Sequence, residues 1–365
     1  MWKKFLLKSV LERKVMEKTA IIYSPKYLEH NPGRGHPESA ERLKAIMNEL
    51  EKSEILKNGQ VEILAPEPAE EKDLMLVHKS DYIELVKKMC SRGGGLLDLG
   101  DTVVSRESFE AAVYAVGGAK MAADLVINGD FRNIFAFVRP PGHHALPYAA
   151  CGFCIFNNIA IAAKHLIQNY NVEKILILDI DAHHGNGTQE VFYETDKVLY
   201  MSLHQDPRGF PGVGFPDEVG KDKGEGFTVN IPFPFRTTDE IYLEAFNEIA
   251  VPIIRQYSPQ FTLMSVGFDC HYTDPVASLW LSANADIHIF KEIYKLTHGR
   301  FVAILEGGYS LEWIGRMAVA AVSIMAGLDY KLEDQPPATS ERVRNRAKDF
   351  LDEVRRVQLA YWNLS

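Results

Sequence analysis

The sequence predicts an α/β fold in which helices cover a mostly parallel β-sheet. Short apolar runs rich in Val, Ile, Leu and Phe alternate with longer segments of helical periodicity, and this alternation is typical of parallel sheets. No internal repeat, low-complexity stretch or Pro/Ser-rich linker interrupts the alternation. The 365 residues exceed the usual length of one domain, but a large parallel sheet can reach this size as a single unit.

The hydrophobic patterns place the individual elements. Strands are expected in the apolar runs Ala20–Tyr23, Ile134–Val138, Lys174–Leu178, Val198–Ser202, Phe261–Val266 and Phe301–Leu305. Helices are expected where apolar residues recur at helical spacing, at Ala40–Glu51, Ser108–Asn128, Asn158–Tyr170, Thr238–Gln256, Ala285–Thr297 and Leu311–Ala326. A charged helix at Ser340–Gln358 is expected to close the chain.

The composition argues against several classes of function. Apolar residues make up 46% and charged residues 24%, which allows a core that keeps water out of an active site. The net charge of −9 argues against direct nucleic-acid binding, which normally needs a basic face. The four cysteines are sparse and irregularly spaced, so we expect no disulfide framework and a cytoplasmic location. A structural zinc at the single Cys151-x-x-Cys154 pair is disfavoured because no second pair accompanies it.

The first 18 residues form a separate feature. Trp2, Phe5, Leu6 and Val10 follow helical spacing with basic residues between them, and no signal-peptide cleavage pattern is present. No apolar run of about 18 residues exists that could span a membrane. We expect residues 1–18 to form an amphipathic helical extension and residues 19–365 to form one domain. The extension would pack on its own domain, or dock on a membrane surface or a partner subunit, including a second copy in a homo-oligomer.

Polar side chains follow five of the predicted strands at the point where each strand ends. In open parallel sheets, ligands bind beyond the carboxyl ends of the strands. These strand ends carry His143 and His144, then Asp179, Asp181 and His183, then His204, Asp269 and Tyr309. Five such endings in one chain indicate an active site at this edge of the sheet.

The segment from Asp179 to His184 predicts a metal site. Alternate residues of an extended chain point the same way, so Asp179, Asp181 and His183 can face one point. A catalytic zinc takes three protein ligands from carboxylate and imidazole groups and leaves a position for water. Asp181 and His183 supply two ligands, and Asp269 after another strand is the best candidate for the third.

Two adjacent histidines indicate acid–base chemistry. His143 and His144 follow a rigid Pro-Pro-Gly turn, which would hold their side chains in fixed directions. Two imidazoles beside a metal-bound water can act as general base and general acid. Each needs an acceptor on its other ring nitrogen. Asp179 is expected to serve one histidine and Asn186 the other.

Tyr309 lies in a Gly-Gly-Tyr turn after the last predicted strand. The glycines would let its hydroxyl swing towards a carbonyl polarised by the metal and stabilise the oxyanion formed on attack. Taken alone, the motif is weak and fits a core tyrosine better.

The order of these motifs resembles that of the histone deacetylase family, which includes acetylpolyamine amidohydrolases. The resemblance runs from about Ile21 to Tyr330 and rests on long, specific segments: RPPGHHA, GFCIFNNIAIAA, DIDAHHGNGTQ, MSLH with GFPGVG, GFDCHYTDP and LEGGYSL. It implies the arginase–deacetylase fold, with a mostly parallel eight-stranded sheet flanked by helices. The chain looks closest to the class II-like prokaryotic branch.

The resemblance also implies metal ions and a path for the product. Asp181, His183 and Asp269 match the ligands of a catalytic Zn²⁺, with Fe²⁺ an alternative in the cell. Arg42 looks like the arginine of an internal acetate channel. One K⁺ site is implied at Asp179, Asp181, His183, Ser202 and Leu203, and a second at Phe192, Thr195, Val198 and Phe227.

The resemblance divides the catalytic roles among five side chains. His143 matches the histidine paired with a buried aspartate, here Asp179. His144 matches the general base, and Tyr309 matches the tyrosine that stabilises the transition state. Asn186 stands where many nuclear deacetylases carry aspartate, and this neutral partner would leave His144 less basic.

The same comparison assigns the substrate tunnel. Its walls are expected at Gly152, Phe153 and Phe210. Asp98 and Asp101 lie where the family often has a rim aspartate that grips the substrate backbone, and Asp101 is taken as the candidate. Val276 falls where the polyamine-selective branch places a gatekeeping glutamate, so its apolar side chain argues against strict polyamine specificity.

The sequence therefore predicts a zinc-dependent amidohydrolase that removes the acyl group from an N-acylated amine, first of all acetyl-lysine in a protein or peptide. A small acylamine such as an acetylpolyamine is the alternative substrate. A binuclear manganese ureohydrolase would need further carboxylates where this chain has His183-His184-Gly185. A catalytically silent acyl-lysine binder is disfavoured because the histidines, the ligands and Tyr309 are all retained.

Overall fold

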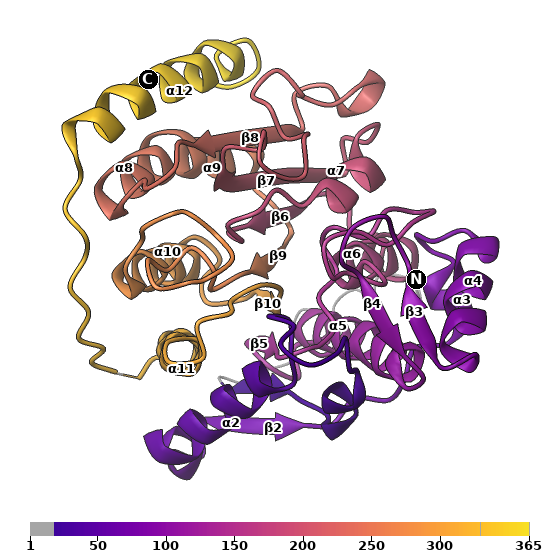
Figure 1. Ribbon diagram of the computed structural model, residues 1–365. Coiled ribbons are helices and arrows are strands. Elements are labelled where there is room, and N and C mark those ends of the chain that lie inside the picture. The colour runs from indigo at the N-terminus through magenta and orange to yellow at the C-terminus, as the bar shows by residue number, and fades with distance from the viewer. Residues whose placement is uncertain (1–17, 329, 365) are drawn as a thin grey trace, which may run out of the picture.

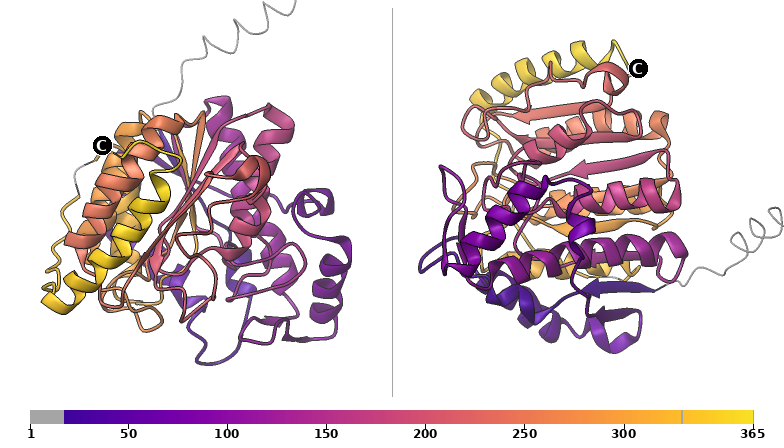
Figure 2. Two further views of the ribbon diagram at one scale, coloured as in Figure 1. Left: turned by 90° about the horizontal axis from the view of Figure 1, so that it is seen from above. Right: turned by 90° about the vertical axis from the view of Figure 1, so that its right-hand side faces the viewer.

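The computed structural model describes residues 18–328 and 330–364, so the expected N-terminal extension lies outside the described residues apart from Lys18. Eight strands form one sheet in the order β2-β1-β5-β10-β9-β6-β7-β8, and every pairing is parallel. Helices cover both faces of this sheet (Figures 1 and 2). The predicted α/β class is confirmed, and the central sheet is wholly rather than mostly parallel.

All six expected strands are present, with shifts of a few residues at their ends. The strands of the central sheet are β1 (Thr19–Ile22), β2 (Val61–Leu64), β5 (Asn133–Ala136), β6 (Ile175–Asp179), β7 (Val198–Gln205), β8 (Thr228–Phe233), β9 (Phe261–Val266) and β10 (Val302–Leu305). The sequence did not predict β2 and β8, which form the two edges. Strand β2 is only half buried, and β8 contains Pro232, a residue that sheets accept mainly at an edge. A separate antiparallel pair joins β3 (Gly94–Leu96) to β4 (Val103–Ser105).

The helices form a layer on each side of the sheet, as the view from above shows (Figure 2). One layer contains α5 (Ser108–Asn128), α6 (Asn158–Tyr170) and α7 (Asn186–Phe192). The other contains α2 (Glu41–Ser53), α11 (Ile314–Met325), α10 (Ala283–Leu296), α8 (Asp239–Ala245) and α9 (Val251–Tyr257). The last helix, α12 (Glu341–Gln358), lies against β8 and α8. The shorter elements are η1 (Pro25–Glu29), η2 (Ile55–Asn58), α3 (Glu71–Leu74), α4 (Ser80–Ser91) and η3 (Asp222–Gly224).

The helix expected at Thr238–Gln256 is not one regular α-helix. It consists of α8 (Asp239–Ala245), a π-helical turn η4 (Phe246–Ala250) and α9 (Val251–Tyr257) in direct succession. Pro252 follows the π turn and has no N–H to donate, so the regular hydrogen-bond ladder cannot continue through it.

The strand order explains how residues far apart in the sequence meet. The chain passes outwards through β6, β7 and β8, and then returns so that β9 and β10 fill the space between β6 and β5. The five strands with polar endings are therefore neighbours, in the order β5-β10-β9-β6-β7. Because all of them are parallel, their carboxyl ends meet at one edge of the sheet.

Candidate active site

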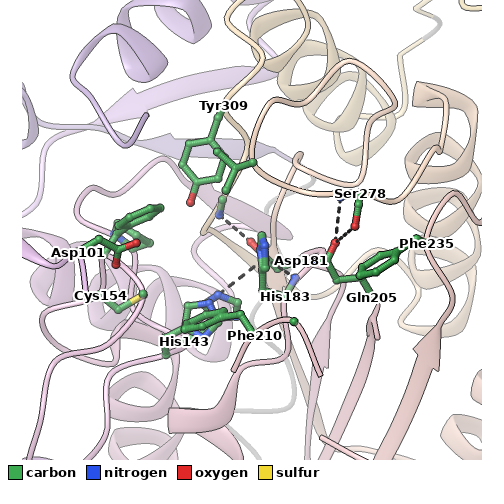
Figure 3. Close-up of a pocket in the computed structure, with 17 residues that line it drawn as sticks. Asp101, His143, Cys154, Asp181, His183, Gln205, Phe210, Phe235, Ser278 and Tyr309 are labelled. Atoms are coloured by element: carbon green, nitrogen blue, oxygen red, sulfur yellow. Dashed lines mark hydrogen bonds and ion pairs between the residues drawn. The ribbon is translucent and has the colours of Figure 1, made fainter. Parts of the chain in front are cut away.

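A cavity of about 420 Å³ opens at this edge (Figure 3). It brings together many of the residues that the sequence singled out: Asp101, His143, His144, Gly152, Phe153, Asp181, His183, Phe210, Val276 and Tyr309. It also contains residues that the sequence did not place in the lining: Pro141, Cys154, Gln205, Gly209, Phe235, Ser278 and Gly307. Arg42 and Asn186 lie behind this lining.

Asp181, His183 and Asp269 converge at the inner end of the cavity. Their ligand atoms all lie within 4.8 Å of one another, and His183 Nδ1 is 2.9 Å from Asp269 Oδ2 and 3.3 Å from Asp181 Oδ1. Main-chain groups fix both carboxylates, because Gly307 N donates to Asp181 Oδ2 (2.8 Å) and Ala182 N donates to Asp269 Oδ1 (2.9 Å). The third candidate ligand thus comes from the loop after β9, the neighbour of β6, as the sequence suggested.

The chemistry of these three side chains fits one divalent metal ion. Two carboxylates and an imidazole are the donor types that zinc accepts in catalytic sites. Burial, together with the charge of Asp181, raises the pKa of Asp269 above its usual value. Two buried carboxylates this close repel each other, and a bound cation would relieve the repulsion. The residues present therefore suit a metal such as zinc.

His143 and His144 lie side by side, with ring centroids 4.0 Å apart, but have different partners. His143 Nδ1 is 3.1 Å from Asp179 Oδ2, whereas His144 Nδ1 is 2.7 Å from Asn186 Oδ1. Burial alone would lower the pKa of His143, but Asp179 and Asp181 raise it to about 10. Burial and the neighbouring histidines hold the pKa of His144 well below its usual value. Opposite shifts of this kind suit one acid and one base.

Tyr309 projects its hydroxyl into the cavity from the loop after β10 (Figure 3). Its main-chain N–H donates to Asp274 Oδ2 (2.6 Å), which holds the start of the loop. Gly308 has a φ of +114°, and a Cβ on Gly307 would lie 2.6 Å from Asp181 Oδ2. The two glycines are therefore needed for backbone conformation and for close approach to the carboxylates.

Phe153 and Phe210 form opposite walls of the cavity. Phe210 packs edge-on against His144, with centroids 4.9 Å apart, and Phe153 packs edge-on against Tyr309 at 5.9 Å. Gly152 and Phe153 occupy a tight turn with φ values of +53° and +67°, closed by reciprocal hydrogen bonds between Cys151 and Cys154. The C-x-x-C pair thus closes the turn that carries one wall, and neither cysteine forms a disulfide.

The rim of the cavity distinguishes the two aspartates that the sequence left unresolved. The Asp98 carboxylate accepts hydrogen bonds from the backbone of Gly100 and Thr102 and from the Thr102 hydroxyl, so it holds its own loop. Asp101 is exposed and lines the cavity. His36 supports this rim, because its Nε2 lies 3.3 Å from the Asp101 carbonyl oxygen and its ring packs on Phe153 at 4.7 Å.

Arg42 is fully buried behind Tyr309, with its guanidinium 4.9 Å from the centre of the tyrosine ring. It donates to the carbonyls of Gly308 (2.6 Å) and Glu306 (2.5 Å). Arg42 and the equally buried Arg139 share one carboxylate, Glu38, at 3.2 and 2.6 Å. Two guanidiniums and one carboxylate leave a net positive charge there, which favours an anion nearby.

The residues of the expected K⁺ sites occupy two separate places. Asp179 and Ser202 are register partners on adjacent strands β6 and β7, next to the Asp181–His183 loop. The other group lies at the opposite end of β7, where Thr195 N donates to the Phe192 carbonyl (3.3 Å) and Tyr200 N donates to the Phe227 carbonyl (3.0 Å).

Two buried residues of the site had no role in the sequence prediction. Glu306 Oε2 accepts hydrogen bonds from Gly142 N (2.6 Å) and His143 N (3.1 Å), and so anchors the turn that carries the histidines. Tyr200 donates its hydroxyl to Asp179 Oδ2 (3.1 Å), the carboxylate that pairs with His143. An acid at the end of an apolar strand was a signal for Glu306, whereas Tyr200 looks like an ordinary core residue of its strand.

A family model described as "Histone deacetylase domain" matches residues 36–325. This chain belongs to the histone deacetylase family. A "Probable deacetylase" of Archaeoglobus fulgidus is 41% identical over 357 residues, which cover 94% of this chain and 98% of the relative. A "Histone deacetylase-like amidohydrolase" of Pseudomonas aeruginosa is 33% identical over 308 residues, which cover 82% and 79%.

The fold agrees with that of a solved histone deacetylase. The crystal structure of the HDA15 HD domain superposes with a TM-score of 0.86 at 33% identity and covers 94% of this chain and 95% of that domain. The chain is therefore an amidohydrolase of the histone deacetylase type, in a family that is metal-dependent. Within the described residues, no helix is both long and apolar enough to cross a membrane.

Proposed function

We propose that this histone deacetylase family member is a zinc-dependent lysine deacylase that hydrolyses the amide of acetyl-lysine in peptides or proteins. The observation that carries the proposal is the arrangement within one cavity. Aromatic walls lead to three converging metal ligands, with a neutral histidine and a tyrosine hydroxyl beside them. Such a passage suits a thin alkyl chain that ends in an acyl amide.

Asp181, His183 and Asp269 would hold the zinc ion. When bound, zinc polarises the acyl carbonyl and lowers the pKa of water. His144 has a low pKa and is therefore free to take the proton of the attacking water. The hydroxyl of Tyr309 donates a hydrogen bond to the oxyanion that develops on the former carbonyl.

His143 acts in the second half of the reaction and is protonated at the start, whereas His144 is neutral. Because Asp179 and Asp181 raise its pKa, it carries a proton that it can give to the leaving amine when the C–N bond breaks. Water and the amide thus become a carboxylate and an amine. Arg42 is assigned to the exit of the carboxylate because the buried cluster of Arg42, Arg139 and Glu38 has an excess of positive charge.

The further assignments from the resemblance belong to the same proposal. Fe²⁺ is the alternative metal, K⁺ occupies the two groups on either end of β7, and Asp101 grips the substrate at the rim. Residues 19–365 act as one catalytic domain in the cytoplasm, without direct nucleic-acid binding. A homo-oligomer contact is assigned to residues 1–18, of which only Lys18 belongs to the described part of the chain.

Acetylpolyamine hydrolysis is the competing function. Val276 lines the cavity with an apolar side chain and offers no counterion to an ammonium group. We therefore expect zinc-loaded protein to turn over acetyl-lysine peptides faster than acetylated polyamines in initial-rate assays. A reversed order would assign the chain to the small-molecule substrates.

Replacement of Tyr309 by Phe tests the chemistry directly. The change removes one oxyanion donor, and loss of such a donor lowers kcat by about 10²–10³-fold. Zinc content and thermal unfolding of the variant control for misfolding. A folded, zinc-loaded Tyr309→Phe protein with near-normal kcat would contradict the role of the hydroxyl.

A further inference from the structure

Part of the cavity lining lies outside the proposed acyl tunnel, whose walls are Gly152, Phe153 and Phe210. Gln205, Gly209, Phe235, Val276 and Ser278 form this part, which we call the side arm. Figure 3 shows Gln205, Phe235 and Ser278 on the side of His183 opposite Asp101 and Cys154. The mechanism proposed above uses neither Gln205 nor Phe235 nor Ser278.

Three loops build the side arm. Gln205 ends β7 and lies beside the metal-binding loop, because its N–H donates to the Ala182 carbonyl (2.8 Å). Phe235 follows β8 and reaches Gly209, since its Cζ is 3.9 Å from the position of a Cβ on that glycine. Ser278 precedes α10, and its carbonyl accepts a hydrogen bond from Arg236 N (2.8 Å). The arm therefore rests on hydrogen-bonded backbone next to the catalytic centre.

The carboxamide of Gln205 has a defined orientation. Its Oε1 accepts hydrogen bonds from both the main-chain N–H and the hydroxyl of Ser278, each at 2.9 Å. A main-chain N–H can only donate, so the oxygen must face Ser278 and Nε2 must face away from it. Among the described residues, Nε2 has no hydrogen-bond partner, although Gln205 is only 6% exposed. Because Gln205 lines the cavity, its Nε2 is available to donate to an acceptor on a bound ligand.

The side arm is otherwise apolar and uncharged. Phe235 is 46% exposed and Val276 is 36% exposed, so the phenyl ring of Phe235 and the methyl groups of Val276 are available for contact. None of the five residues of the arm is an acid. A polyamine carries ammonium groups, which would find neither a counterion nor an acceptor on the apolar surface. A peptide carries carbonyl acceptors next to side chains that can be apolar.

We propose that the side arm is a subsite for the peptide chain that flanks the acyl-lysine. Gln205 Nε2 donates to a main-chain carbonyl of the substrate, while Phe235 and Val276 receive an adjacent apolar side chain. This inference rests on the proposed deacylase function and makes it more specific, because it assigns the substrate to peptides with apolar flanking residues.

The test uses Gln205→Glu in the full-length, zinc-loaded protein. A carboxylate keeps the acceptor for both Ser278 hydrogen bonds, removes the donor and adds a negative charge. Its kcat/KM is measured on an acetyl-lysine peptide with flanking leucines, the same peptide with flanking glycines, and N⁸-acetylspermidine. Gln168→Glu, on the exposed part of α6, is the matched charge control.

We expect Gln205→Glu to lower the ratio of kcat/KM for peptide over acetylspermidine by about tenfold, mainly through KM, because the carboxylate cannot donate to the peptide carbonyl and repels it. Phe235→Ala should remove the preference for leucine over glycine flanks while the glycine peptide is still hydrolysed. Gln168→Glu should leave both ratios at the wild-type value.

Two results separate the possible failures. In the first, the wild type hydrolyses all three substrates, but Gln205→Glu and Phe235→Ala leave unchanged both the peptide-to-acetylspermidine ratio and the leucine-to-glycine ratio of kcat/KM. This result overturns the subsite, and the deacylase function stands. If the zinc-loaded wild type hydrolyses none of the substrates, the proposed function fails and the subsite fails with it.

Discussion

His143 and His144 are adjacent in the chain, yet their surroundings push their pKa values in opposite directions. Two carboxylates raise the pKa of His143 to about 10, while burial and positive neighbours lower that of His144. The two histidines also differ in the group that faces Nδ1. This group is the carboxylate of Asp179 for His143 and the neutral amide of Asn186 for His144. Burial and the neighbouring histidines lower the pKa of His144 most, and Asn186 is the neighbour whose replacement by a charged residue would change it directly.

Replacement of Asn186 by Asp should move the pH dependence of the reaction. A carboxylate favours the charged imidazolium, so it raises the pKa of His144 and keeps the base protonated up to a higher pH. We expect the acidic limb of the kcat/KM profile to shift to higher pH, with a loss of rate at pH 6 that recovers at higher pH. Superimposable profiles of the two proteins would show that His144 is not the group titrating in that limb.

Glu306 shows how one element holds the residues of another. It directly follows β10, but its carboxylate accepts hydrogen bonds from the N–H groups of Gly142 and His143 after β5, the neighbouring strand. Ser265 on β9 donates to its other oxygen (3.2 Å), so the three adjacent strands are joined below the histidine turn. Burial raises the pKa of Glu306 to about 7.

Glu306→Ala should weaken both the fold and the reaction. It leaves two buried N–H groups without an acceptor, which we expect to lower the free energy of unfolding by about 2–4 kcal/mol and to reduce kcat by loosening His143. Glu306→Gln keeps an oxygen for these N–H groups and should restore most of the stability. Denaturant unfolding and initial rates measure both effects, and an Ala variant as stable as the wild type would refute this anchoring role.

Most of the elements could be predicted, and the errors have physical causes. Central strands are apolar on both faces and stand out in the sequence, whereas the edge strand β2 is half buried and does not. The π turn before Pro252 was missed because apolar spacing does not report a local change in the hydrogen-bond ladder.

At the scale of the whole molecule, the strand endings predicted which side chains lie close together, whereas the roles of these side chains stay predictions. The closeness of Asp181, His183 and Asp269 followed from their positions at strand ends, and β9 does lie beside β6. Gln205 could not be assigned in this way, because an isolated glutamine after a strand has no distinctive spacing. Its role emerges only when Ser278, 73 residues further on, fixes the direction of its carboxamide.

The strand order also explains why the site depends on the complete sheet. The proposed ligands lie in the loops after β6 and β9, the two histidines in the loop after β5 and the tyrosine in the loop after β10. These strands are neighbours in space but not in sequence, so the catalytic groups are placed only when the long connections have folded. Catalysis and global folding are therefore expected to be lost together.

Zinc-dependent turnover of an acetyl-lysine peptide is the most direct test of the central claim. The protein is stripped with a chelator, its metal content is measured, and acetate release is followed before and after titration with Zn²⁺. We predict no turnover without metal, because the peptide carbonyl is then not polarised, and full recovery at one Zn²⁺ per chain, with Asp181→Ala unable to recover. Stoichiometric zinc binding without acetate release, or acetate release that is the same in the stripped protein, would contradict the account.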